Sequence, residues 1–85
     1  MVKELTFPFD LFGRTAMLFV HGTQEVLKNP IQLGNSNRRV NAKSLRGILS
    51  LGIKKGDTIS VFYQEEEDFR VMEEIINLLQ EELQW

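Results

Sequence analysis

The segment that most restricts the fold is the run from Thr58 to Tyr63, because an extended chain would place Ile59, Val61 and Tyr63 on one side of it. Alternation with a period of two is typical of a β-strand that buries one face. A strand of this kind needs neighbouring strands and a layer that covers its apolar face. The rest of the chain must therefore supply both.

Two further regions have strand character. In the segment Val2–Phe7, apolar residues stand two apart, and Pro8 ends the run because proline cannot donate a ladder hydrogen bond. The second region is a hairpin, in which the arms Pro30–Leu33 and Val40–Ala42 flank turn-forming asparagine and serine residues. These segments supply the partners that the strand ending at Tyr63 requires.

Three segments have helical spacing. The first, Arg14 to about Leu27, carries an apolar stripe, and the second, Leu45–Leu51, stands between Ser44 as N-cap and Gly52 as a left-handed C-cap. The third follows the acidic run Glu65–Asp68, which we expect to be a solvated helix start that suits the helix dipole. Its stripe consists of Phe69, Met72, Ile75, Ile76, Leu79 and Leu83.

The predicted order is βαββαβα, without linker, repeat or low-complexity tract, so residues 1–85 are expected to form a single domain. A mixture of this kind predicts an α+β fold in which helices cover one face of one sheet, an open-faced sandwich. Two positions are open to the terminal Trp85, the sheet edge or a second subunit.

Composition excludes several function classes. The chain has no cysteine, which excludes disulfides and thiolate chemistry, and its net charge of −2 argues against direct binding to nucleic acid or to an anionic membrane. The longest apolar run, Ala16–Val20, is too short to cross a bilayer. His21 is the only histidine, and one imidazole cannot hold a metal ion alone. The acidic run Glu65–Asp68 lacks the ligand spacing of a calcium loop, so a calcium site is not expected there. We expect a cytoplasmic protein that is not an enzyme and has no metal site and no cofactor.

Two segments carry the remaining chemistry. Between Asp10 and Ala16 an irregular stretch opens the first helix, where free N–H groups and Arg14 form a candidate anion site. Between Asn41 and Ile53, Ser44 stands at a helix N-terminus beside Lys43. Taken alone, Ser44 is explained as an N-cap that contributes about 1 kcal/mol.

The second segment resembles the HPr phosphocarrier family of the bacterial sugar phosphotransferase system (PTS). That family has a regulatory serine in the context N-x-K-S-hydrophobic-x-G-hydrophobic-x-S-L-G, and Ser44 stands at the matching position. The turn Lys54–Asp57 and the order of elements also resemble the family. The resemblance implies a four-stranded antiparallel sheet with three helices on one face.

The same family carries a Gly-hydrophobic-His-Ala-Arg-Pro-Ala segment, whose histidine takes phosphate from Enzyme I. Matching it to Asp10–Ala16 keeps Arg14 and Ala16 on the pattern, but Phe12 stands at the histidine and Thr15 at the proline. The match requires one extra residue before Ser44. A phenyl ring has no nucleophilic nitrogen, so the resemblance implies that histidine phosphocarrier function is lost, as in the Crh-type catabolite-repression members of the family.

The resemblance therefore implies a regulatory binding protein that HPr kinase/phosphorylase modifies on Ser44 and that a CcpA-type regulator or PTS components bind. Phe12 either covers the helix end or anchors an interface. Other roles stay open: a carrier that uses another residue such as His21, an Enzyme I decoy, and an assembly module. The expected anion or partner contacts are Phe12, Arg14, Thr15, Lys43, Leu45, Arg46, Ile48 and Leu49.

Overall fold

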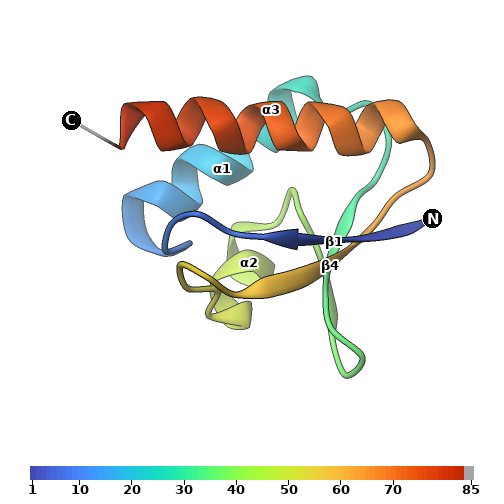
Figure 1. The fold of residues 1–85 in the computed structure, drawn as a ribbon, viewed down its shortest axis with the longest axis horizontal. Coiled ribbons are helices and arrows are strands. Elements are labelled where there is room, and N and C mark those ends of the chain that lie inside the picture. The colour runs from blue at the N-terminus through green and yellow to red at the C-terminus, as the bar shows by residue number, and fades with distance from the viewer. Residues whose placement is uncertain (84–85) are drawn as a thin grey trace.

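A computed structural model describes residues 1–83, and its elements follow the predicted βαββαβα order. In chain order they are β1 (Val2–Thr6), α1 (Gly13–Val26), β2 (Gln32–Gly34), β3 (Arg39–Asn41), α2 (Leu45–Leu51), β4 (Thr58–Phe62) and α3 (Glu66–Glu82). Figure 1 shows α3 running along the molecule above α1 and the sheet. Trp85 lies outside the described residues.

The strands form one four-stranded antiparallel sheet in the order β1-β4-β2-β3. β4 lies between β1 and β2, and its buried Val61 pairs with Leu33 of β2, which in turn pairs with Val40 of β3. These side chains share one face of the sheet because they occupy one cross-strand row. The alternation that predicted β4 is therefore the alternation between a core face and an open face.

The hairpin between β2 and β3 is tight. A Cβ atom at Gly34 would overlap the backbone carbonyl of Arg38, so glycine is required where the two strands approach each other. In the turn, the Asn35 side-chain oxygen accepts hydrogen bonds from the N–H groups of Asn37 and Arg38, at 2.8 and 3.0 Å. The turn residues predicted from composition thus close the hairpin through their own side chains.

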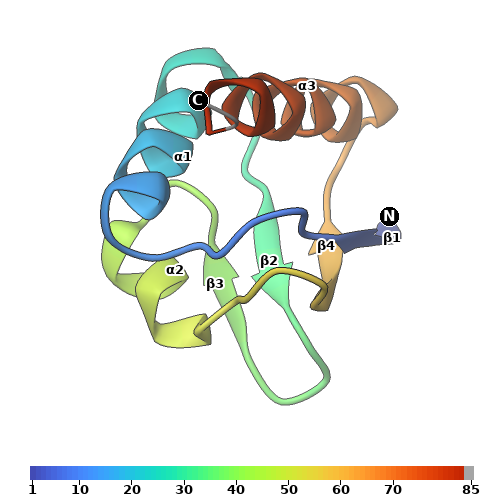
Figure 2. The same cartoon turned by 60° about the vertical axis from the view of Figure 1, so that its left-hand side comes forward.

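The helices and the inner sheet face share one buried cluster. Phe19 of α1, Ile48 of α2 and Met72 of α3 belong to it together with the core row of the sheet. Phe7 follows β1 and packs edge-on against Phe19, with ring centroids 5.9 Å apart. The helices therefore cover one face of the sheet, and Figure 2 shows α3 above it with α1 and α2 along one side. This confirms the predicted open-faced α+β fold.

The start of α3 corrects one expectation. Asp68 is only 4% exposed, although the acidic run to which it belongs was expected to be solvated. Its Oδ2 accepts from the Glu65 backbone N–H at 3.3 Å and from Asn29 Nδ2 at 3.1 Å. The carboxylate caps the helix and is buried because the segment that follows α1 brings a donor to it.

Candidate functional site

Ser44 is the N-cap of α2, as predicted. Its Oγ accepts a hydrogen bond from the Gly47 N–H at 3.1 Å, and its side chain is half-buried. A Cβ atom at Gly47 would lie 2.9 Å from Cβ of Val40 and 3.3 Å from Ser44 Oγ. The glycine therefore lets the first turn of α2 pack closely on β3. This close packing keeps the Ser44 hydroxyl at the helix end.

The side chains beside Ser44 divide into two groups. Leu45 and Leu49 are exposed and stand four residues apart on α2, so they share one side of the helix. Ile48 was expected to contact a partner, but it is 0% exposed and belongs to the core cluster. That expectation was wrong for Ile48, because α2 turns this position toward β3 and α1. The exposed apolar surface of α2 consists of the two leucines.

The two basic residues near Ser44 also differ. The Lys43 ammonium donates to the backbone carbonyl of Leu27 at 2.8 Å, so it neutralises the carbonyl end of α1. It is therefore engaged with α1, and the expected anion or partner contact of Lys43 stays a prediction. Arg46 is exposed in the first turn of α2, on the helix end that an anion at Ser44 would face. Of the two, Arg46 is the cation placed to meet a partner.

Phe12 is the N-cap of α1 and is 61% exposed, so its ring does not cover the helix end as a buried group. Gly13 follows with φ +57°, a left-handed conformation that glycine adopts without strain. Arg14 is exposed and Thr15 is half-buried. The first turn of α1 thus presents an aromatic ring and a guanidinium to solvent, beside N–H groups that the phenyl side chain cannot cap.

Hydrogen bonds fix which ends of α1 and α2 lie together. Near the end of α1, the Gln24 side chain donates a hydrogen bond to the carbonyl of Lys43, just before α2, at 2.8 Å. Just before α1, the Leu11 backbone N–H donates to the carbonyl of Ile53, just after α2, at 2.9 Å. The helices are therefore antiparallel.

Phe12 lies at the end of α2 that carries Leu49, and Ser44 lies at the other end, about 10 Å away along the helix.

His21 lies away from Phe12 and the start of α1. It is nine positions beyond Phe12, about 13 Å along α1, and its side chain is exposed with Nε2 3.7 Å from Glu25 Oε1. Within residues 1–83, histidine, aspartate and glutamate side chains form no group of three that could hold a metal ion. The same part of the chain contains no helix with the length and apolar character needed to span a membrane.

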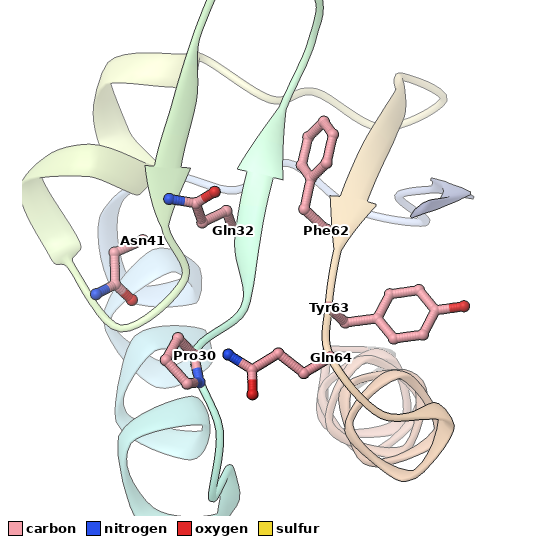
Figure 3. Close-up of a pocket in the computed structure, with 6 residues that line it drawn as sticks. All are labelled: Pro30, Gln32, Asn41, Phe62, Tyr63 and Gln64. Atoms are coloured by element: carbon pink, nitrogen blue, oxygen red, sulfur yellow. The ribbon is translucent and has the colours of Figure 1, made fainter. Parts of the chain in front are cut away.

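A hollow of about 340 Å³ lies elsewhere, on the open face of the sheet. Figure 3 shows the amides of Gln32, Asn41 and Gln64 around it, while the Tyr63 ring points away. Arg39 stacks on the nearby ring of Phe62, with its guanidinium carbon 3.8 Å from the ring centroid. None of the predicted site residues lines this hollow, so the hollow and the candidate site are different surfaces.

The chain matches the family model described as "PTS HPr component phosphorylation site" over residues 4–81. This chain belongs to the HPr family. The match covers both helix starts discussed above, with Phe12 and Ser44, and it confirms the resemblance seen in the sequence.

Two HPr-family relatives are both named HPr-like protein Crh. The protein from Bacillus subtilis is 29% identical over 80 residues, covering 94% of this chain and 93% of the relative. The protein from Halalkalibacterium halodurans is 30% identical over 79 residues and covers 93% of each chain. The chain is thus similar to HPr-like proteins over almost its whole length.

Solved HPr structures have the same fold. The crystal structure of HPr-C-His from Thermoanaerobacter tengcongensis superposes with a TM-score of 0.70 at 29% identity, covering 93% of this chain and 91% of the other. The phosphocarrier protein HPr from Bacillus anthracis gives a TM-score of 0.75 at 26% identity, with coverages of 91% and 93%. These neighbours agree with the sheet and helix arrangement described above.

Two contacts of the HPr-family chain were absent from the sequence predictions: the Lys43 bond to Leu27, and the Asp68 bond to Asn29. Both join residues that are distant in sequence. For the Asp68 contact, the only local signal was its position three residues after Glu65, which is a capping pattern. For the Lys43 contact, it was the position of this lysine near the N-terminus of α2.

Proposed function

We propose that this HPr-family protein is a regulatory binding module that does not carry phosphate on histidine and that is switched by phosphorylation of Ser44. The observation that carries the proposal is the exposed phenyl ring of Phe12 at the N-cap of α1, where the family motif has its histidine. A phosphoacceptor needs a lone pair on a nucleophilic atom, and a phenyl ring offers none.

Phosphorylation of Ser44 would place about two negative charges at the start of α2. The fold supports this, because Ser44 Oγ already accepts from the Gly47 N–H and the helix dipole stabilises an anion at this end. The exposed Arg46 supplies a nearby positive charge, while Lys43 is held by α1. We expect the fold to stay intact and the surface chemistry to change.

The change would be felt by partners. Leu45 and Leu49 form an apolar strip directly after Ser44, and a phosphate at its end converts it into a mixed apolar and anionic surface. A CcpA-type transcriptional regulator is the proposed partner, with the strip, Phe12 and Arg14 as contacts. Exposed aromatic and arginine side chains are the residue types that most often anchor interfaces.

The direct test is incubation with an HPr kinase/phosphorylase and ATP, followed by intact-mass and fragment-ion analysis. We expect one phosphoryl group on Ser44 and none on the Ser44→Ala variant. Ser50→Ala is the matched control, since Ser50 is an exposed serine of the same helix, and it should be modified as the wild type is. An unmodified wild-type protein, or a phosphoryl group on Ser50, would contradict the proposal.

A second candidate function is that of an Enzyme I decoy, and the exposed Arg14 beside Phe12 favours it, since the family motif has an arginine at that position. A decoy would occupy Enzyme I without accepting phosphate. It should slow phosphoenolpyruvate-dependent labelling of a histidine-bearing HPr in a concentration-dependent way, and Arg14→Ala should weaken that effect. Unchanged labelling at a large excess of this protein would remove the candidate.

A further inference from the structure

A second apolar surface lies on the other side of α1, where that helix packs against α3. The hollow between the helices has a volume of about 200 Å³ and is lined by Leu18, Gly22, Val26, Ile75, Leu78 and Leu79. Leu78 is 63% exposed and Val26 is 52% exposed. Each helix therefore turns one large apolar side chain to solvent beside an apolar groove.

Gly22 gives the groove its depth. A Cβ atom at this position would lie 3.2 Å from Cγ2 of Ile75, so glycine lets α1 and α3 approach closely and leaves their meeting line concave. Leu78 and Val26 line the same groove and are exposed. Clustered exposed apolar side chains around a concavity are a feature of interaction sites, whereas apolar side chains scattered singly over a surface need no explanation.

The rim of the groove is acidic. Leu78 has Glu74 four residues before it, and Glu81 and Glu82 three and four residues after it. These spacings place the three glutamates on the same side of α3 as Leu78, and all three are exposed. On α1, Glu25 lies three residues after Gly22, on the same side of the helix, and is exposed.

Basic side chains beside these carboxylates are fewer. His21 Nε2 lies 3.7 Å from Glu25 Oε1. Lys28 lines the adjoining hollow of about 170 Å³, together with the acidic start of α3. The four carboxylates around Leu78 and Val26 outnumber these basic side chains, so the groove is apolar at its centre and negative at its edge.

We propose that this groove binds a basic amphipathic helix of a partner protein. The apolar side chains of the partner helix, spaced three and four residues apart, would pack against Leu78 and Val26. The lysine or arginine residues that flank them would pair with the glutamates of the rim. A second copy of this chain fits less well, because its own groove has the same acidic rim and like charges would face each other.

The groove and the proposed regulator surface are independent. α1 contacts α3 on one side and α2 on the other, and Figure 2 shows α1 between them. A partner in the groove would therefore leave Ser44, Leu45 and Leu49 uncovered. The protein could hold two partners at once, of which only one would sense phosphorylation of Ser44.

The test uses two synthetic helical peptides of about 18 residues, long enough to form a helix. Both carry leucine on one face; the other face carries lysine in one peptide and glutamate in the other. Titrated into ¹⁵N-labelled protein, the lysine peptide should shift the amide resonances of the groove residues, while the glutamate peptide should shift none. The affinity for the lysine peptide should fall as salt is raised.

Variants separate the two features of the groove. Leu78→Gln should weaken binding of the lysine peptide about tenfold, since an exposed apolar anchor is lost. The double variant Glu74→Gln, Glu81→Gln should weaken it and flatten its salt dependence. Leu45→Gln, an equally conservative change on the regulator surface, should leave the affinity for the peptide unchanged.

Several outcomes would overturn the inference. One is a set of resonance shifts centred on α2 or on the open sheet face, and another is equal binding of the two peptides. A third is concentration-dependent dimerisation in sedimentation experiments that Leu78→Gln abolishes, because the groove would then be occupied by a second copy. Failure of Ser44 phosphorylation would leave this inference untouched, since no step of it uses Ser44.

Discussion

At the scale of single residues, the chemistry of the HPr-family site depends on what stands at two helix starts. Phe12 occupies the N-cap of α1 and Ser44 occupies the N-cap of α2. The first cannot form a bond to phosphorus, while the second has a hydroxyl that is held at the positive end of a helix. In the proposed function, Phe12 removes carrier chemistry and Ser44 provides the switch.

We expect Phe12→His to restore phosphate acceptance. With Enzyme I and phosphoenolpyruvate, the wild-type protein should gain no acid-labile phosphoryl group. The variant should gain one, because the imidazole would stand at an exposed helix start beside Arg14. Phosphate-sensitive gel electrophoresis or intact mass at neutral pH would measure the label. Acid-labile phosphate on the wild-type protein at His21 would instead show that a different carrier residue is in use.

Local signals predicted these residues, but they did not predict every neighbour. Ser44 as N-cap follows from its own sequence context. Ile48 and Leu49 are both apolar and adjacent, and only the packing of α2 on β3 and α1 decides that Ile48 is buried and Leu49 is exposed. Lys43 likewise bonds to the carbonyl of Leu27, a contact that depends on how α1 and α2 meet.

At the scale of elements, α3 is fixed at its start by groups from other parts of the chain. Asp68 joins the first turn to Asn29, 39 positions earlier, and also bonds to the Glu65 N–H. Lys3 of β1 reaches Glu66, with Nζ 2.7 Å from the carboxylate oxygen, and lies 4.9 Å from the Phe69 ring centroid. The acidic run is therefore a structural anchor at these two positions.

Replacing the buried carboxylate should destabilise the fold. Asp68→Ala removes a helix cap and leaves the Asn29 amide without this acceptor, so we expect the free energy of unfolding to fall by about 2 kcal/mol. Urea unfolding followed by circular dichroism would measure it. Glu73→Ala, an exposed position of the same helix, is the control and should change it by less than about 0.5 kcal/mol. Equal stability of the two variants would contradict the anchoring role of Asp68.

The Lys3 and Glu66 pair gives a prediction for pH. The hydrogen bond that Lys3 donates to Glu66 holds the pKa of Glu66 below its ordinary value, and the same bond raises the pKa of Lys3. The Glu66 contribution to stability is therefore present above the unfolded-state pKa and is lost as pH falls through the folded-state pKa. The Lys3 contribution is present below its unfolded-state pKa and is lost as pH rises through the folded-state value.

Lys3→Met should therefore move the pKa of Glu66 upward toward its ordinary value. A titration of the Glu66 side-chain carboxyl carbon by NMR would measure this, and stability would then depend less on pH in the acidic range. Lys54→Met, a change at an exposed lysine outside the pair, should leave the Glu66 titration unchanged. A Glu66 pKa that is the same in the wild type and in Lys3→Met would contradict the assigned cause.

Elements were predictable where their signals are local. β4 follows from alternation over a few residues, and α2 follows from Ser44 and from Gly52, whose φ is +61°. The Asp68 contact was not predictable, because burial of a carboxylate depends on a donor that arrives from a distant segment. The acidic run therefore looks the same in sequence whether its members are solvated or buried.

At the scale of the whole molecule, α1 separates two exposed surfaces. On one side lie Phe12, Leu49 and Ser44, along the antiparallel pair of α1 and α2. On the other side lies the acidic-rimmed groove with Leu78 and Val26. The open face of the sheet is a third surface, and helices cover the opposite face.

In the proposed function, phosphorylation of Ser44 controls binding to a regulator. The most direct measurement is titration calorimetry of a purified CcpA-type regulator with the phosphorylated protein, the unmodified protein and Ser44→Ala. We predict that the phosphorylated form binds at least about tenfold more tightly than the other two, as expected for a new charge-assisted contact. Equal and negligible affinity of all three forms would contradict the account.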